Sequence, residues 1–217
     1  MDNSAVIAAL VGAALALVPP VWHFSRHVVT LVHEAGHAMV AVLTGRRLNA
    51  VRLHSDTSGH TISSGRPHGP GMVAMASAGY LAPSVLGLAC IWLVGVGHTP
   101  WALWAALLTL ALMLVYVRNW FGLLVVAVAG GAVAILIWRT NPEIQDFAAI
   151  VLAGFLLVAA PRTTLDLWSH RRSARTRTTD ADLLARLTHV PAGVWNAFLL
   201  LATVAALLLG VGLLRSA

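Results

Sequence analysis

The chain has 217 residues, of which 59% are hydrophobic and 10% are charged, and its mean hydropathy is +0.81. This composition leaves too little polar surface for a water-soluble domain, so it excludes a soluble enzyme and predicts an integral membrane protein surrounded by a lipid bilayer. The formal net charge is +6, and the basic residues are arginines because the chain has no lysine. Arginine clusters are typical of cytoplasmic loops in membrane proteins, so we expect no nucleic-acid partner.

Apolar segments long enough, or nearly long enough, to cross a bilayer recur along the chain. They lie at 5–23, 27–44, 71–97, 101–118, 120–138, 144–161 and 193–214. The first is interrupted at Pro19-Pro20, and two others are short enough that one of them could be re-entrant, namely 101–118 and 144–161. We therefore predict an all-α polytopic membrane protein with about six to seven transmembrane helices.

The segment at 45–70 differs from the apolar segments around it. Val51 and Leu53, followed by the turn-forming residues 55–59, predict a short β-hairpin. A hairpin here would offer an edge strand to an extended peptide. We accordingly divide the chain into an N-terminal transmembrane helix (1–26), a membrane-embedded core with the hairpin (27–161), a basic cytoplasmic connection (162–192) and a C-terminal transmembrane helix (193–217).

The arginines also predict the orientation of the chain. With seven spans and a cytoplasmic N-terminus, all arginines lie in cytoplasmic loops except Arg26, Arg139 and Arg215. This bias favours a cytoplasmic N-terminus and places the connections 45–70 and 162–192 on the same, cytoplasmic side.

One run in the second apolar segment carries ionisable side chains where lipid is expected: His33-Glu34-Ala35-Gly36-His37. On a helix, His33 and His37 fall at i and i+4 on one face, so both imidazoles reach one zinc ion while Glu34 serves as general base. Without a partner, such groups would cost several kcal/mol in a lipid span. The sequence therefore predicts a Zn²⁺ site of the metalloprotease type inside the membrane.

These features resemble the site-2 protease family, the intramembrane zinc metalloproteases, in its branch of bacterial membrane metallopeptidases. The matching pieces beyond the histidine motif are Thr44-Gly45, Ser58-Gly59, Ala78-Gly79-Tyr80-Leu81-Ala82-Pro83 and Arg118-Asn119 before Gly122. The resemblance implies a multi-pass protein of the bacterial cytoplasmic (inner) membrane that hydrolyses peptide bonds within or near the transmembrane segments of membrane-protein substrates. It also implies that Asn119 binds the substrate backbone or the developing oxyanion, although a polar residue at the turn between two spans is an equally simple interpretation.

The third zinc ligand is the point where this chain departs from the family pattern. That pattern is N-x-x-P-x-x-x-L-D-G with its aspartate on the metal, whereas Gly122 and Ala127 stand here at the proline and aspartate positions. A catalytic zinc normally has three protein ligands and an open position for water. We predict that Asp166 replaces the missing ligand, because acids are scarce and Asp166 follows a leucine at the cytoplasmic end of the sixth segment. Three other acids stay open as alternatives: Asp56, Asp180 and Asp182.

Two other functions stay open as well. A pseudo-protease that keeps zinc as a membrane scaffold fits the missing aspartate at Ala127 but not the intact Glu34. A metal transporter fits the intramembrane histidines, but the segments 101–118 and 120–138 carry few polar residues to line an ion path.

Overall fold

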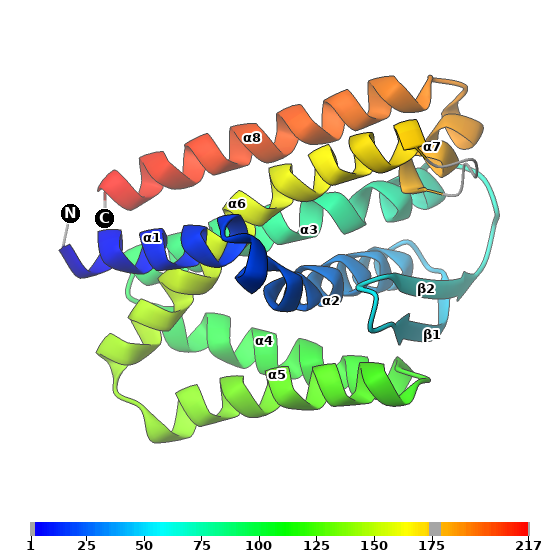
Figure 1. The fold of residues 1–217 in the computed structure, drawn as a ribbon. Coiled ribbons are helices and arrows are strands. Elements are labelled where there is room, and N and C mark those ends of the chain that lie inside the picture. The colour runs from blue at the N-terminus through cyan, green and yellow to red at the C-terminus, as the bar shows by residue number, and fades with distance from the viewer. Residues whose placement is uncertain (1–2, 174–178, 217) are drawn as a thin grey trace.

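The computed structural model describes residues 3–173 and 179–216, which form eight helices and one two-stranded sheet. The elements in chain order are α1 (Asn3–Leu17), α2 (Pro19–Leu43), β1 (Arg47–Leu53), β2 (Gly59–Ser64), α3 (Pro70–Gly95), α4 (Thr99–Tyr116), α5 (Trp120–Arg139), α6 (Pro142–Ser173), α7 (Asp180–Thr188) and α8 (Ala192–Ser216). Figure 1 shows a helical bundle with the start of α1 and the end of α8 at one end, and the hairpin and α7 at the other.

Five helices are long and apolar enough to cross a membrane, namely α3, α4, α5, α6 and α8. α1 and α2 pass the same test only as a pair, because they are bent by 98° at the break between them. With 15 residues, α1 is about 22 Å long, which is shorter than the roughly 30 Å hydrocarbon core. The predicted fold class is confirmed, and the described residues contain five candidate spans, or six if the bent pair is one span, against the six to seven predicted.

The break between α1 and α2 lies at Val18. The boundary between the predicted segments 5–23 and 27–44 therefore lies earlier in the chain than we expected. Pro19 and Pro20 are the first residues of α2. The first residues of a helix form no intrahelical hydrogen bond through their N–H groups, so proline is tolerated at these positions. The last carbonyls of α1 are orphaned by the break and need partners in a bilayer. Ser25 Oγ donates to Leu15 O at 2.8 Å, and the Arg162 guanidinium donates to Ala16 O. These hydrogen bonds from α2 and α6 therefore satisfy two of the backbone carbonyls at the end of α1.

α6 is longer than the predicted segment 144–161, because it continues through Pro161 to Ser173. Its first half packs closely on α1, where Gly12 lies against the backbone of residues 151–155 and Gly154 lies against Ala9. The predicted connection 162–192 therefore contains the end of α6 and all of α7. Of the arginines predicted to mark this connection, Arg175 and Arg177 lie outside the described residues.

The predicted β-hairpin at 45–70 is present. β1 and β2 are antiparallel, with Val51 opposite Thr61 and Leu53 opposite Gly59. Val51 and Leu53 are buried in a core with residues of α2, α4 and α5. The chain between α4 and α5 continues the sheet on the other side of β1, where Arg118 N donates to Val51 O at 3.0 Å. The hairpin is thereby fixed beside the middle of α2.

Candidate metal centre

Three ligand atoms from two distant parts of the chain converge beside the hairpin. The Nε2 atoms of His33 and His37, one turn apart on α2, lie 3.0 Å from each other. Asp180 Oδ2, from the first residue of α7, lies 3.2 Å from His33 Nε2 and 3.3 Å from His37 Nε2. These residues form a group of three potential metal ligands in the part of the chain that the structure describes.

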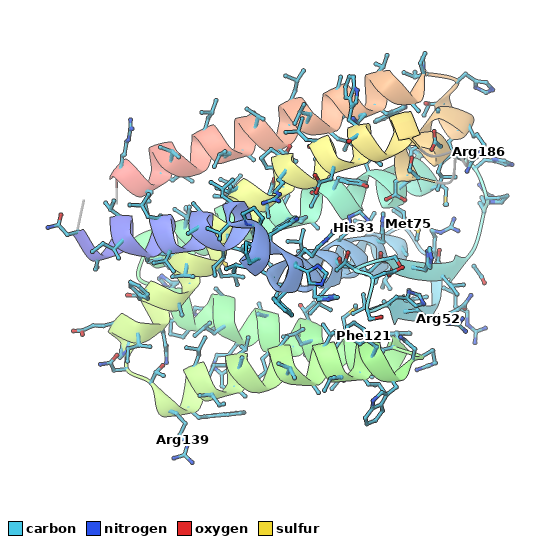
Figure 2. The ribbon with its side chains drawn as sticks, in the orientation of Figure 1. His33, Arg52, Met75, Phe121, Arg139 and Arg186 are labelled. Atoms are coloured by element: carbon cyan, nitrogen blue, oxygen red, sulfur yellow. The ribbon has the colours of Figure 1, made fainter. Side chains whose placement is uncertain are left out.

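Neighbouring groups orient both imidazoles. His37 Nδ1 lies 2.7 Å from Met75 O on α3, to which it donates, so the opposite nitrogen, Nε2, faces Asp180. A second hydrogen bond of this kind fixes the tautomer and raises the basicity of a metal-ligating histidine. The ring of His33 packs edge-on against Tyr80, with 4.8 Å between the ring centroids. Figure 2 shows His33 and Met75 in the interior of the bundle.

Gly79 makes room for the two imidazoles. A Cβ atom at this position of α3 would lie 2.5 Å from His33 Cε1 and Nε2 and from His37 Nε2. Gly36, within the motif, allows the same close approach one turn away, because its Cβ would lie 2.5 Å from Ala82 Cβ. Gly79 belongs to the matching piece Ala78–Pro83, and the packing of α3 on α2 gives it this specific role.

The start of α7 holds Asp180 in place. Thr179 caps the helix in a capping box, in which its hydroxyl lies 2.6 Å from Asp182 Oδ2 and accepts from Asp182 N. Burial of Asp180 opposes its ionisation, but its contacts with His33 and His37 outweigh burial and hold the pKa of this carboxyl well below its ordinary value. Asp180 therefore faces the histidines as a carboxylate.

The structure places the predicted ligand Asp166 on α6, where its side chain is exposed and lines a cavity that is also lined by His33, His37 and Asp180. It does not belong to the group of converging ligand atoms. Asp56, at the tip of the hairpin, binds the backbone N–H and hydroxyl of Ser58, and Asp182 is used in the capping box. Of the four acids considered from sequence, Asp180 is the one that lies against His33 and His37.

Glu34 lies beside the histidines and is held by the second strand. Its side chain is 3% exposed, and Thr61 Oγ1 donates to Glu34 Oε2 at 2.6 Å. Gly59 is needed in the same strand, because a Cβ there would lie 2.5 Å from Glu34 Oε1. Thr30 Oγ1 completes the contact between α2 and the hairpin by donating to Thr57 O at 2.9 Å.

Asn119 does not lie at this site. Its side-chain Oδ1 accepts from Leu53 N at 3.2 Å, and its Nδ2 donates to Leu53 O at 2.5 Å, so both ends of the amide bind one residue of β1. Gly122 supports this arrangement, because a Cβ there would lie 2.7 Å from Asn119 Oδ1. These contacts fit the simpler of the two interpretations, a polar residue at the turn between two spans that positions the hairpin, and a role of Asn119 toward the substrate stays a prediction.

A cavity of about 930 Å³ connects the converging side chains with the surface. Its walls come from α2, the hairpin, α3, α6 and the start of α7, and they include Thr30, Glu34, Tyr80 and Asp166. The site is therefore buried within the bundle and still accessible to a ligand.

The donor set fits a zinc ion. Donors about 2.0–2.1 Å from a tetrahedral zinc lie roughly 3.3 Å apart, and the three observed separations are 3.0, 3.2 and 3.3 Å. Two imidazoles and one carboxylate also match the ligands of catalytic zinc sites that keep a fourth position for water. The chemistry and the separations of these three residues therefore fit a metal ion such as zinc.

Comparison with known proteins agrees with this geometry. A family model described as Peptidase M50B-like matches residues 6–210, nearly the whole chain. No curated protein and no solved structure matches the chain. The resemblance inferred from the motifs is confirmed: the chain belongs to the Peptidase M50B-like family, within the site-2 proteases.

Proposed function

We propose that this protein is an intramembrane zinc metalloprotease that hydrolyses peptide bonds within or near the transmembrane segments of membrane-protein substrates. Membership of the family implies a peptidase. The finer proposal depends on one observation, the convergence of His33, His37 and Asp180 beside Glu34. Asp180 supplies an acidic ligand from elsewhere in the chain, so alanine at position 127 does not favour the pseudo-protease alternative.

The residues of the site have distinct roles in this proposal. His33, His37 and Asp180 hold the metal, which when bound polarises the scissile carbonyl and lowers the pKa of a water molecule. Glu34 takes the proton from that water and passes it to the leaving amine. Thr61 holds the Glu34 carboxylate in place through its hydroxyl. We propose Asp180 as the third ligand in place of Asp166.

The hairpin suggests how the substrate is presented. Among the described residues β2 pairs with β1 alone, so its other edge is open to an extended peptide. Thr61 of this strand contacts Glu34, so a peptide added at the open edge would pass close to the general base. A substrate helix must unwind locally to adopt this conformation.

We place the protein in the bacterial cytoplasmic membrane, as a multi-pass protein whose hairpin and α7 face the cytoplasm. Figure 2 shows Arg52 and Arg186 near this end of the bundle and Arg139 at the opposite end. With α1 and α2 as one broken span, the start of α1 lies at the end opposite the hairpin. The arginine bias then favours a non-cytoplasmic N-terminus, in place of the cytoplasmic N-terminus predicted from a count of seven spans.

The decisive experiment uses the full-length protein purified in detergent, with Glu34→Gln as the test variant. We expect the wild type to bind one zinc ion and to cleave single-span substrates, and the variant to bind zinc equally but to lose proteolysis, because Glu34 is a base and not a ligand. Loss of zinc from Glu34→Gln would contradict the assigned role. Zinc binding without proteolysis by the wild type would favour the scaffold alternative.

A further inference from the structure

The cavity at the metal centre contains a second group of polar side chains, at its other end. Trp22, Arg26 and Arg162 line this part of the cavity, and Trp22 is 5% exposed. The Arg162 guanidinium lies 4.3 Å from the centroid of the Trp22 ring, and that of Arg26 lies 5.9 Å from it. Cations within apolar helices are costly and usually mark a functional site.

These two arginines lack a full set of acidic partners. Within residues 3–173 and 179–216, no ion pair to a carboxylate within 4.0 Å is found for Arg26 or Arg162. Asp166, one turn from Arg162 on α6 towards the metal centre, lines the cavity as well. Asp56 of the hairpin lines the cavity too, and its carboxylate accepts hydrogen bonds from the backbone N–H and the hydroxyl of Ser58.

Arg162 and Arg26 differ in what holds them. Arg162 donates to Ala16 O and stacks on Trp22, so part of its role is to satisfy the end of α1. An arginine stacked in this way keeps further N–H donors at the edge of its plane for a carboxylate. Within the described residues, the guanidinium of Arg26 makes only the looser contact with Trp22, so it is held less firmly than that of Arg162.

We propose, building on the proteolytic function proposed above, that Arg26 and Arg162 form a specificity subsite for an acidic side chain of the substrate. Arg26 precedes His33 and Glu34 by about two helical turns, which is about 10–12 Å along α2. An extended peptide advances about 3.3 Å per residue, so the acidic residue lies about three to four residues from the scissile bond. A carboxylate matches the paired edge donors of a guanidinium, and Trp22 excludes water beneath it.

A degenerate peptide library tests this subsite in two ways. The zinc-loaded wild type is incubated with the library, and the sequences around each cut are read by mass spectrometry. Immobilised Glu34→Gln protein captures peptides from the same library without cleaving them. We expect Asp and Glu to be enriched about tenfold or more at one position, three to four residues from the cut, in both the cleaved and the captured pools.

Arg26→Gln is the test variant, because Arg162 also supports the fold and its loss risks unfolding. In both assays Arg26→Gln should remove the acidic preference while peptides with glutamine at that position are bound as before. Arg139→Gln removes the same charge at the far end of α5 and is the matched control (Figure 2). Arg162→Lys keeps the positive charge but loses the paired N–H donors of the planar guanidinium. This variant should therefore weaken the preference for acidic residues in part.

Each other outcome overturns a defined claim. Glu34-dependent cleavage without acidic enrichment, or with enrichment that Arg26→Gln leaves unchanged, overturns the subsite and leaves the protease proposal intact. Acidic capture that depends on Arg26 without any cleavage by the wild type supports the subsite and overturns the protease proposal. If phosphatidylglycerol in the micelle is retained through Arg26 and no acidic peptide is selected, the arginines bind lipid phosphate and the subsite for substrate is wrong.

Discussion

Thr61 and Glu34 are joined by a hydrogen bond of 2.6 Å, from the hydroxyl of the second strand to the carboxylate in the middle of α2. The same hydroxyl lies 3.2 Å from the backbone carbonyl of Glu34. A single side chain thus fixes the proposed general base to the strand along which we expect the substrate to lie. This contact links substrate binding to the orientation of Glu34.

The first prediction follows from this contact. Thr61→Val keeps the shape of the side chain but removes the hydroxyl, so we expect kcat to fall about tenfold or more while zinc content is unchanged. Thr61→Ser is the matched control and should keep most of the activity. An unchanged kcat in Thr61→Val would show that Glu34 needs no support from the strand.

The second prediction concerns Gly79, whose Cβ would lie 2.5 Å from three imidazole atoms. Gly79→Ala should displace His33 or His37 and abolish zinc binding, because a methyl group at 2.5 Å and the two imidazoles cannot all keep their positions. Gly130→Ala, on α5 where a Cβ meets nothing within 4 Å, is the control and should keep zinc. The measurement is zinc content by mass spectrometry on folded protein, and full occupancy in Gly79→Ala would contradict the described packing.

The third prediction separates the acids at the site. Asp180→Ala should lose zinc and activity, because Asp180 is the carboxylate that lies against both histidines. Asp166→Ala should keep zinc, since Asp166 lines the cavity without joining the ligand atoms. If zinc is lost from Asp166→Ala and kept in Asp180→Ala, the choice of ligand derived from the motif is right and the one derived from the structure is wrong.

Local sequence signals were enough to predict part of this site and the hairpin beside it. His33, Glu34 and His37 form a motif within five residues, and its helical spacing alone brings the two imidazoles together. The hairpin depends on neighbouring turn residues and on the alternation that buries Val51 and Leu53. Both features need no knowledge of distant parts of the chain.

The acid that lies against the two histidines depends on packing that the sequence does not reveal. The sequence favours Asp166 because acids are scarce and Asp166 follows a leucine at the end of the sixth segment, but α6 continues past it to Ser173 and leaves its side chain exposed. Asp180 reaches α2 because α7 packs on α3 and α8. The available signal was the helix start at Thr179, in which a threonine is followed by an acid three residues later.

The last prediction concerns the side of the membrane on which the chain begins. The double proline at 19–20 lies at the break between α1 and α2, and with these two helices taken as one bent span, one span fewer precedes the hairpin than in a count of seven. Cysteine introduced at Ser4 and at His68 tests this arrangement. The native Cys90 is buried and is replaced by alanine to give a silent background. In intact cells and in inverted vesicles, a membrane-impermeant maleimide should label the two positions from opposite sides, with His68→Cys reached from the cytoplasm.

Labelling of both positions from the cytoplasm would restore two complete spans before the hairpin and the cytoplasmic N-terminus. In that case α1 would have to cross or enter the bilayer by itself.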